Sequence, residues 1–205
     1  MARRRAKVKG DPVHGILLLN KPSGITSNSA LQKAREMLRA QKGGHTGSLD
    51  PIATGLLPLC FGNTTKWSGY FLHSDKHYKT TIKLGESTDT GDSEGKITFS
   101  NDKLLHQGEV LRVLEKFMGT YLQTPPMYSA IKINGERSYK LARKNINVEH
   151  QPRLIEIYKL ILKQVINSDF AEFEVVCGKG TYVRSLARDI SEKLCTKGHV
   201  AMIRR

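Results

Sequence analysis

A glycine-rich loop around a single carboxylate is the segment most able to carry chemistry. Residues 43–55 contain four glycines and one proline. This composition disfavours a regular helix or strand and permits close approach of the backbone to a ligand. Asp50 directly precedes Pro51, which biases it toward an extended conformation. Because His45 and two hydroxyl side chains add polar groups, we interpret the loop as presenting Asp50. The alternative is a simple Asp-Pro turn.

A second candidate site is the turn at residues 178–184, where a strand, a glycine turn and a helix start follow one another. Free amide groups and the helix dipole favour an anion there, either a phosphate or a protein carboxylate. Lys179 and Arg184 add positive charge. Arg184 and Arg188 share a helix face, and the alternative is that both are solvated. The chain contains no Gly-x-x-x-x-Gly-Lys-Ser/Thr pattern, so this turn is not a nucleotide-binding P-loop.

Tyr78 lies in the basic segment 75–79, where a strand is expected to begin. An aromatic ring among positive charges suits stacking on an unpaired nucleobase. The alternative is a tyrosine that packs in the core.

The elements that position these segments follow from hydrophobic periodicity. We expect buried strands at 16–19 and 154–162, a further strand at 77–84, and a half-exposed strand ending near Cys177. Asn134-Gly135 predicts a hairpin turn. Residues 85–95 are expected to form a polar turn. Its carboxylates, Asp89, Asp92 and Glu94, are expected to be solvated, since they lack a calcium-binding pattern.

Three helices complete the prediction. One begins after Thr26 or Ser27, one spans about 110–117, and one follows Tyr182. Their expected apolar faces are Leu31, Ala34 and Leu38; Val110, Leu111, Val113, Leu114 and Phe117; and Val183, Leu186, Ala187, Ile190 and Leu194. Because strands dominate and strict βαβ repeats are few, we expect an α+β fold with a mixed, mainly antiparallel sheet flanked by helices.

The charge balance points to a polyanionic partner. The 205 residues include 33 Lys and Arg against 19 Asp and Glu, a formal charge of +14. Such a charge indicates association with nucleic acid more than it indicates a fold. No apolar run is long enough to span a membrane, so we expect no membrane partner. Residues 1–14 are expected to form a basic, disordered arm.

The three cysteines, Cys60, Cys177 and Cys195, are far apart and lack metal-ligand spacing to a histidine. They predict neither a disulfide framework nor a zinc site. Cys60 and Cys177 are expected to pack as small apolar residues. We therefore expect a reducing, cytoplasmic compartment and no bound metal.

The order of these motifs resembles the TruB family of tRNA pseudouridine synthases, of the bacterial type. The resemblance rests on residues 19–24, the Asp50 loop, 75–78, 88–92 and 179–184, and it runs from about Gly15 to Arg205. It implies the pseudouridine synthase catalytic fold over 15–205, with a thumb-like lobe inserted at about 124–152. Family members usually continue into a C-terminal PUA-type domain, which we do not expect in this chain.

The resemblance also implies an activity and assigns roles. The activity is isomerisation of uridine to pseudouridine at position 55 of the tRNA T-loop, by base flipping and without a cofactor. Asp50, Tyr78 and Arg184 match catalytic residues. His45, Tyr182, Lys21 and Lys179 are expected to contact the substrate, although the motif containing Lys21 is also expected to support the Asp50 loop. We expect a monomer that binds the T-arm. The alternatives are a guide-RNA-dependent synthase and a non-catalytic module that folds tRNA.

Overall fold

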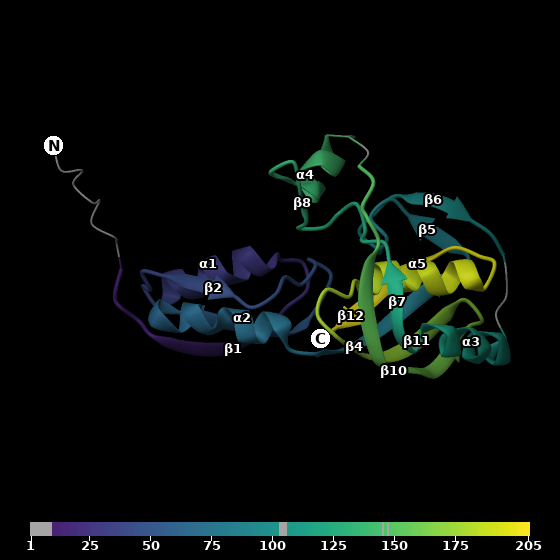
Figure 1. The fold of residues 1–205 in the computed structure, drawn as a ribbon, viewed down its shortest axis with the longest axis horizontal. Coiled ribbons are helices and arrows are strands. Elements are labelled where there is room, and N and C mark those ends of the chain that lie inside the picture. Colours follow the sequence, from purple (N-terminus) through teal and green to yellow (C-terminus); the bar gives the residue numbers. More distant parts are fainter. Residues whose placement is uncertain (1–9, 103–105, 145, 147) are drawn as a thin grey trace. The chain divides into compact units, whose positions relative to one another are not determined.

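The computed structural model describes residues 10–102, 106–144, 146 and 148–205 (Figure 1). Residues 1–9 of the predicted basic arm lie outside this range. The chain divides into two compact units, Met1–Ser74 and Asp75–Arg205. The named strands pair only antiparallel within the described residues, so the predicted α+β fold with a mainly antiparallel arrangement is confirmed.

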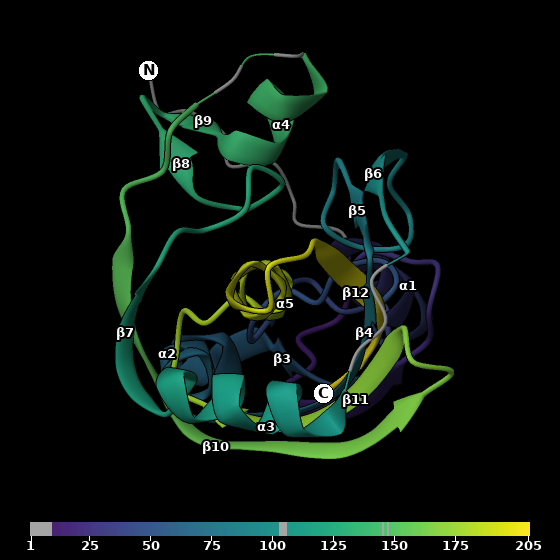
Figure 2. The same cartoon turned by 90° about the vertical axis from the view of Figure 1, so that its right-hand side faces the viewer.

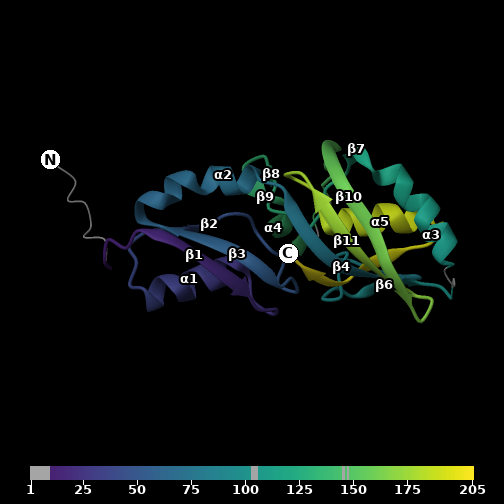
Figure 3. The same ribbon diagram turned by 90° about the horizontal axis from the view of Figure 1, so that it is seen from below.

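The first unit is built on a three-stranded sheet in the order β1-β3-β2. These strands are β1 (Gly15–Lys21), β2 (Gly43–His45) and β3 (Gly55–Phe61). Figure 3 shows them between the helices α1 (Ser27–Met37) and α2 (Ser68–His73), the second preceded by the 3-10 helix η1 (Gly62–Trp67).

The predicted start of α1 is confirmed, because the hydroxyl of Thr26 accepts a hydrogen bond from the Ser29 amide at 3.0 Å. Leu31 and Ala34 are buried as expected. Leu38 is not part of the buried face. It is the C-cap residue of the helix, and its side chain is 41% exposed.

The prediction that residues 43–55 contain no regular strand is wrong at its beginning. Residues Gly43–His45 form β2 and pair with residues 59–61 of β3. Glycine suits the start of this strand, because a Cβ atom at Gly43 would lie 3.1 Å from side-chain atoms of Arg35 and Phe61. The close approach of these two side chains explains why glycine occurs in a strand here.

The second unit contains a five-stranded sheet in the order β12-β4-β11-β10-β7. Its strands are β4 (Lys76–Leu84), β7 (Gly119–Gln123), β10 (Arg153–Ile166), β11 (Phe170–Cys177) and β12 (Gly198–Arg204). Figure 2 shows the sheet curving around α5 (Val183–Lys193). The predicted apolar face of α5 is confirmed, since all five of its residues are buried.

The helix α3 (Gln107–Leu114) packs on β10 and continues into the 3-10 helix η2 (Glu115–Phe117). Val110, Val113, Leu114 and Phe117 are buried as predicted, but Leu111 is 45% exposed.

Three strand predictions need correction. The expected buried strand at 16–19 lies in β1, where Ile16, Leu17 and Leu18 are 46%, 39% and 67% exposed. The expected buried strand at 154–162 belongs to β10, where burial alternates: Ile155 and Ile157 are buried, whereas Leu154 is 69% exposed. The expected turn at 85–95 begins with a strand, since β5 (Glu86–Thr88) pairs with β6 (Ile97–Ser100). Polar composition concealed this short pairing.

A lobe extends from the second unit between β7 and β10 (Figures 1 and 2). It contains β8 (Lys132–Ile133), β9 (Glu136–Arg137) and α4 (Ser138–Arg143). The predicted hairpin is confirmed, with positive φ angles of 50° at Asn134 and 85° at Gly135, as expected for a two-residue turn. At the base of the lobe, the hydroxyl of Ser138 donates to the Met127 carbonyl and lies 2.8 Å from Nε2 of His150.

Candidate active site

The backbone around Asp50 is fixed on both sides by the first unit. Before it, the Ser27 hydroxyl accepts a hydrogen bond from the Leu49 amide at 2.7 Å and lies 3.1 Å from the Leu49 carbonyl, to which it can donate. After it, the Ala53 amide donates to the Asp50 carbonyl at 3.0 Å. Leu49 and Ala53 are buried, whereas Asp50 itself is half-buried. The loop therefore holds its one carboxylate between two anchored residues.

Lys21, at the end of β1, supports the same loop through hydrogen bonds to backbone carbonyls. Its side chain is fully buried, and its ammonium group donates to the carbonyls of Pro22 (2.8 Å), Ile25 (2.7 Å) and Pro51 (3.2 Å). The Gly24 amide also donates to the Pro51 carbonyl, at 2.9 Å. A buried charge is stable only when it is paired or solvated by polar groups. These contacts favour the supporting role of Lys21 over the predicted contact with substrate.

His45 is half-buried at the end of β2, opposite Leu59 of β3. The next residue, Thr46, is buried, and its amide donates to the Pro58 carbonyl at 3.1 Å. Pairing between β2 and β3 therefore fixes the backbone of His45. Its predicted contact with RNA stays a prediction.

In the second unit, the side chain of Arg184 is buried rather than solvated. Its guanidinium donates to the carbonyls of Thr90 (3.0 Å) and Tyr128 (2.8 Å), and its Nε lies 3.8 Å from a carboxylate oxygen of Asp92. Only 7% of the residue is exposed. The guanidinium is thereby oriented by two segments that are far apart in the sequence, the turn at 90–92 and the backbone at Tyr128, as its rigid fork of donors allows.

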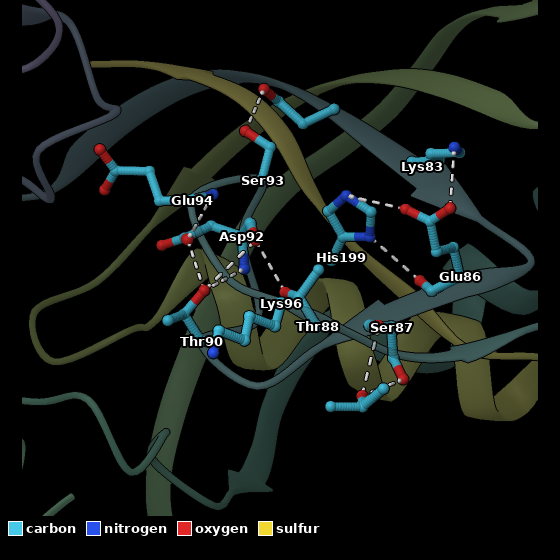
Figure 4. A network of polar contacts seen from close by, with 12 residues as sticks. Lys83, Glu86, Ser87, Thr88, Thr90, Asp92, Ser93, Glu94, Lys96 and His199 are labelled. Carbon is cyan, nitrogen blue, oxygen red and sulfur yellow. Dashed lines mark hydrogen bonds and ion pairs between the residues drawn. The ribbon is translucent and has the colours of Figure 1, made fainter. Parts of the chain in front are cut away.

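The prediction of a solvated acidic turn is confirmed for Asp89 and Glu94, which are exposed, and is wrong for Asp92. Asp92 is 4% exposed, and Figure 4 shows its carboxylate in a network of polar contacts. One carboxylate oxygen accepts hydrogen bonds from the Thr90 hydroxyl at 2.6 Å and the Glu94 amide at 3.2 Å. The Thr88 hydroxyl donates to the Asp92 carbonyl at 2.7 Å. The two threonine hydroxyls preceding the aspartate were the sequence signal for this buried turn.

Lys179 and Tyr182 both lie in the turn that precedes α5. Lys179 is exposed, Tyr182 is half-buried, and the Thr181 hydroxyl donates to the Gly178 carbonyl at 3.0 Å. Tyr182 is the N-cap residue of α5, and its side chain makes no capping hydrogen bond. The amide side chain of Gln123 instead contacts the Tyr182 backbone. Sequence reasoning missed Gln123, because a single glutamine at a strand end carries no recognisable pattern.

Tyr78 lies on β4 opposite Val175 of β11 and is 9% exposed. Its burial agrees with the core alternative, and its predicted stacking on a nucleobase stays a prediction.

Cys60 and Cys177 are fully buried, as predicted. Burial raises the pKa of both thiols, that of Cys177 to about 11.

Within the described residues, no group of three or more His, Cys, Asp or Glu side chains could hold a metal ion. In the same part of the chain, every helix is too short or too polar to cross a membrane.

A protein-family model for the TruB family pseudouridylate synthase (N terminal domain) matches residues 35–183. The chain belongs to the TruB family. The matched range includes His45, Asp50, Tyr78 and Tyr182, and it ends one residue before Arg184.

Curated relatives in the TruB family are similar over nearly the whole chain. A tRNA pseudouridine synthase B of Nitrosococcus oceani is 46% identical over 204 residues, which cover 99% of this chain and 66% of the relative. One of Pseudomonas fluorescens (strain Pf0-1) is 51% identical over 193 residues, covering 94% of this chain and 63% of the relative. The chain thus spans slightly less than two thirds of the length of these relatives.

Solved structures confirm the fold of a pseudouridine synthase. A chain in the crystal structure of a Cbf5-Nop10-Gar1 complex superposes with a TM-score of 0.72 and 26% sequence identity, covering 94% of this chain and 48% of that one. A chain from an H/ACA RNP bound to a substrate RNA has a TM-score of 0.69, covers 98% of this chain and 53% of that one, and at 21% identity supports the fold alone.

Proposed function

We propose that this chain carries the catalytic part of a tRNA pseudouridine synthase, which isomerises uridine to pseudouridine at position 55 of the T-loop. The observation that carries the proposal is the Asp50 loop. It lies within the span that matches the TruB family, and a fully buried lysine holds its backbone. Relatives at 46–51% identity are tRNA pseudouridine synthases. The formal charge of +14 supports an RNA substrate.

The reaction needs an ionised carboxylate. Detaching uracil from C1′ of the ribose develops positive charge on the sugar, and a carboxylate can stabilise or capture that charge. Asp50 then acts by adding to the sugar, by adding to the base, or by removing a proton, and each of these routes starts from the anion. Because uridine and pseudouridine are isomers, the overall reaction involves no net oxidation and transfers no group to another molecule.

Arg184 fits the role of the guanidinium that keeps this carboxylate ionised. Its contacts with the Thr90 and Tyr128 carbonyls fix the plane of the guanidinium. A fixed cation stabilises a carboxylate anion better than a mobile one, because less conformational entropy is lost. The family resemblance assigns this role to Arg184.

The target uridine must leave its stack to be modified, which costs a few kcal/mol. We propose that His45 enters the T-loop in place of the base and that Tyr78 packs on the extruded uracil. Stacking on an aromatic side chain contributes about 1–3 kcal/mol per base, enough to offset much of that cost. Tyr182 is proposed to contact the nucleoside and the exposed Lys179 a phosphate. In this proposal the protein acts as a monomer on tRNA in the cytoplasm.

The test measures tritium release from a T-arm stem-loop labelled at C5 of uridine, with RNA binding measured in parallel. Wild-type chain should release tritium, and Asp50→Asn should bind the RNA but release none. Asp102→Asn is the matched control, since Asp102 is exposed on the second unit. Binding without any turnover by the wild type would favour the tRNA-folding alternative.

A guide-dependent synthase is the second candidate, because the solved structure at 26% identity is part of a complex with Nop10 and Gar1. Turnover of the bare stem-loop, without guide RNA or partner proteins, would exclude it. Turnover that appears only when such partners are added would establish it in place of the stand-alone enzyme.

A further inference from the structure

The side chain of Gln123, at the end of β7, makes two hydrogen bonds to the backbone of Tyr182, one to its amide and one to its carbonyl. The backbone amide of Tyr182 donates to the side-chain oxygen of Gln123 at 2.8 Å. The side-chain nitrogen of Gln123 donates to the backbone carbonyl of Tyr182 at 3.2 Å. Gln123 is 1% exposed. These two hydrogen bonds fix both the position and the orientation of the Tyr182 backbone.

These two hydrogen bonds lie where α5 begins. The Tyr182 carbonyl also accepts the first helical hydrogen bond, from the Leu186 amide at 3.0 Å. The unpaired amide groups at a helix start need partners from elsewhere. The side chain of Tyr182 supplies no cap, but Gln123 on a distant strand accepts a hydrogen bond from one of these amides, that of Tyr182 itself. The position of Tyr182, and of Arg184 two residues later, is therefore set by β7.

A chain of polar contacts fixes the orientation of the glutamine amide. Its nitrogen donates to the Tyr121 hydroxyl at 2.8 Å, and that hydroxyl donates to Asp189 at 3.4 Å. The other Asp189 oxygen accepts from Arg188 at 2.7 Å. Burial, the largest cause, and the charge of Asp189 raise the pKa of Tyr121, so the phenol stays protonated. With the nitrogen engaged by acceptors, the amide oxygen must face the Tyr182 amide.

A second pair of bonds joins the same two elements. The Ser185 hydroxyl and the Arg188 guanidinium donate to the Thr124 carbonyl at 2.8 and 3.0 Å. The end of β7 is thus attached to the first turns of α5 at several points. Gln123 is the member of this set whose side chain bonds the backbone immediately before the helix.

We propose that Gln123 is a positioning residue for pseudouridine formation: it holds the Tyr182 peptide and thereby places the side chains of Tyr182 and Arg184 for the reaction. This inference rests on the proposed function. Gln123 itself is buried within the second unit and does not contact RNA, so we expect its loss to affect the rate of reaction more than RNA affinity. A displacement of about 1 Å in catalytic groups can cost about 10²-fold in rate.

Two substitutions separate the contributions of Gln123. Gln123→Met keeps the length of the side chain and removes its hydrogen bonds. Gln123→Glu keeps an acceptor for the Tyr182 amide and replaces the donor with a carboxylate oxygen. For both variants we expect kcat on the T-arm stem-loop to fall about 10²-fold, with KM and RNA affinity within about threefold of wild type.

The Gln123→Glu variant supplies a pH signature. A buried carboxyl group has a raised pKa, and its protonated form regains a hydroxyl donor. The ratio of variant to wild-type kcat should therefore rise as the pH falls from 8 toward 6. Gln164→Glu is the matched control, because Gln164 is exposed on β10 of the same sheet. Its ratio to wild type should not change with pH.

Val110→Ala controls for lost stability, since Val110 is fully buried on α3 and has no proposed role in the reaction. At a similar loss of thermal stability its kcat should stay within twofold of wild type. Gln123→Met would then be distinguished from a variant that is merely less stable. Equal kcat losses in Val110→Ala and Gln123→Met, or none in Gln123→Met, would overturn the proposal.

Amide hydrogen exchange tests the two hydrogen bonds between Gln123 and Tyr182 without a measurement of enzymatic turnover. Exchange at Tyr182 should accelerate in Gln123→Met relative to Val110→Ala, and unchanged exchange would overturn the inference. If the wild type lacked activity, the proposed function would fail, and the exchange measurement would still decide whether Gln123 holds the helix start.

Discussion

Replacing Lys21 with methionine should both destabilise the protein and slow the reaction. Lys21→Met keeps most of the apolar side chain and removes the ammonium, which bonds three carbonyls from a fully buried position. Each hydrogen bond from a charged donor contributes about 1.5–3 kcal/mol. Burying the ammonium costs several kcal/mol in return, so the net effect is much smaller than the sum of the bonds.

The expected loss follows from the carbonyls that the substitution leaves behind. The Pro51 carbonyl keeps its hydrogen bond from the Gly24 amide, whereas those of Pro22 and Ile25 lose the lysine. An unsatisfied buried acceptor costs about 1–3 kcal/mol, but Pro22 is exposed and Ile25 is half-buried, so water can take over part of the bonding at these carbonyls. Because the desolvation cost of the ammonium disappears as well, we expect a decrease of about 1–3 kcal/mol in the free energy of unfolding.

Urea unfolding measures this change, and tritium release at saturating RNA measures turnover per folded molecule. Lys33→Met is the matched control, because Lys33 is exposed on α1 and both residue types are good helix formers. Turnover of Lys21→Met should fall at least tenfold, since Pro51 directly follows Asp50. A free energy of unfolding equal to that of Lys33→Met, or unchanged turnover, would refute the supporting role of Lys21.

Three further predictions concern charge and reactivity. Arg184→Lys should lower turnover about 10²-fold and leave RNA affinity within about threefold of wild type. The reason is that lysine cannot bond both the Thr90 and Tyr128 carbonyls with one planar group. Equal losses of turnover and RNA affinity would make Arg184 a phosphate contact. At pH 8 a thiol reagent should modify the exposed Cys195 first, since a pKa of about 11 leaves Cys177 with about 10²-fold less thiolate than an ordinary thiol; equal rates would contradict its burial. The logarithm of the RNA binding constant should fall linearly with the logarithm of salt concentration, by about 0.7–0.9 per phosphate contacted, and a flat response would show that the charge plays no part in binding.

Local patterns predicted much of the fold because local physics determines those elements. The start of α1 follows from the capping hydroxyl of Thr26, the apolar face of α5 from its helical periodicity, and the hairpin turn from Asn134-Gly135. In each case the deciding residues lie within a few positions of one another. The same holds for the alternation along β11.

The predictions that failed depended on contacts between distant residues. Asp92 is buried because Arg184, far along the sequence, packs against its turn. Gly43 joins a strand because β3 offers a partner. The supporting roles of Lys21 and Gln123 were likewise hidden, since their acceptors are backbone carbonyls, which carry no signature in the side-chain sequence.

The central claim is that the carboxylate of Asp50 makes pseudouridine in tRNA. Its most direct test is mass-spectrometric mapping of pseudouridine in T-arm RNA treated with wild-type chain and with Asp50→Asn. The account predicts complete conversion of a single uridine, at position 55, by the wild type, and none by a variant that still binds the RNA. Pseudouridine formed by Asp50→Asn at a rate near that of the wild type would contradict it.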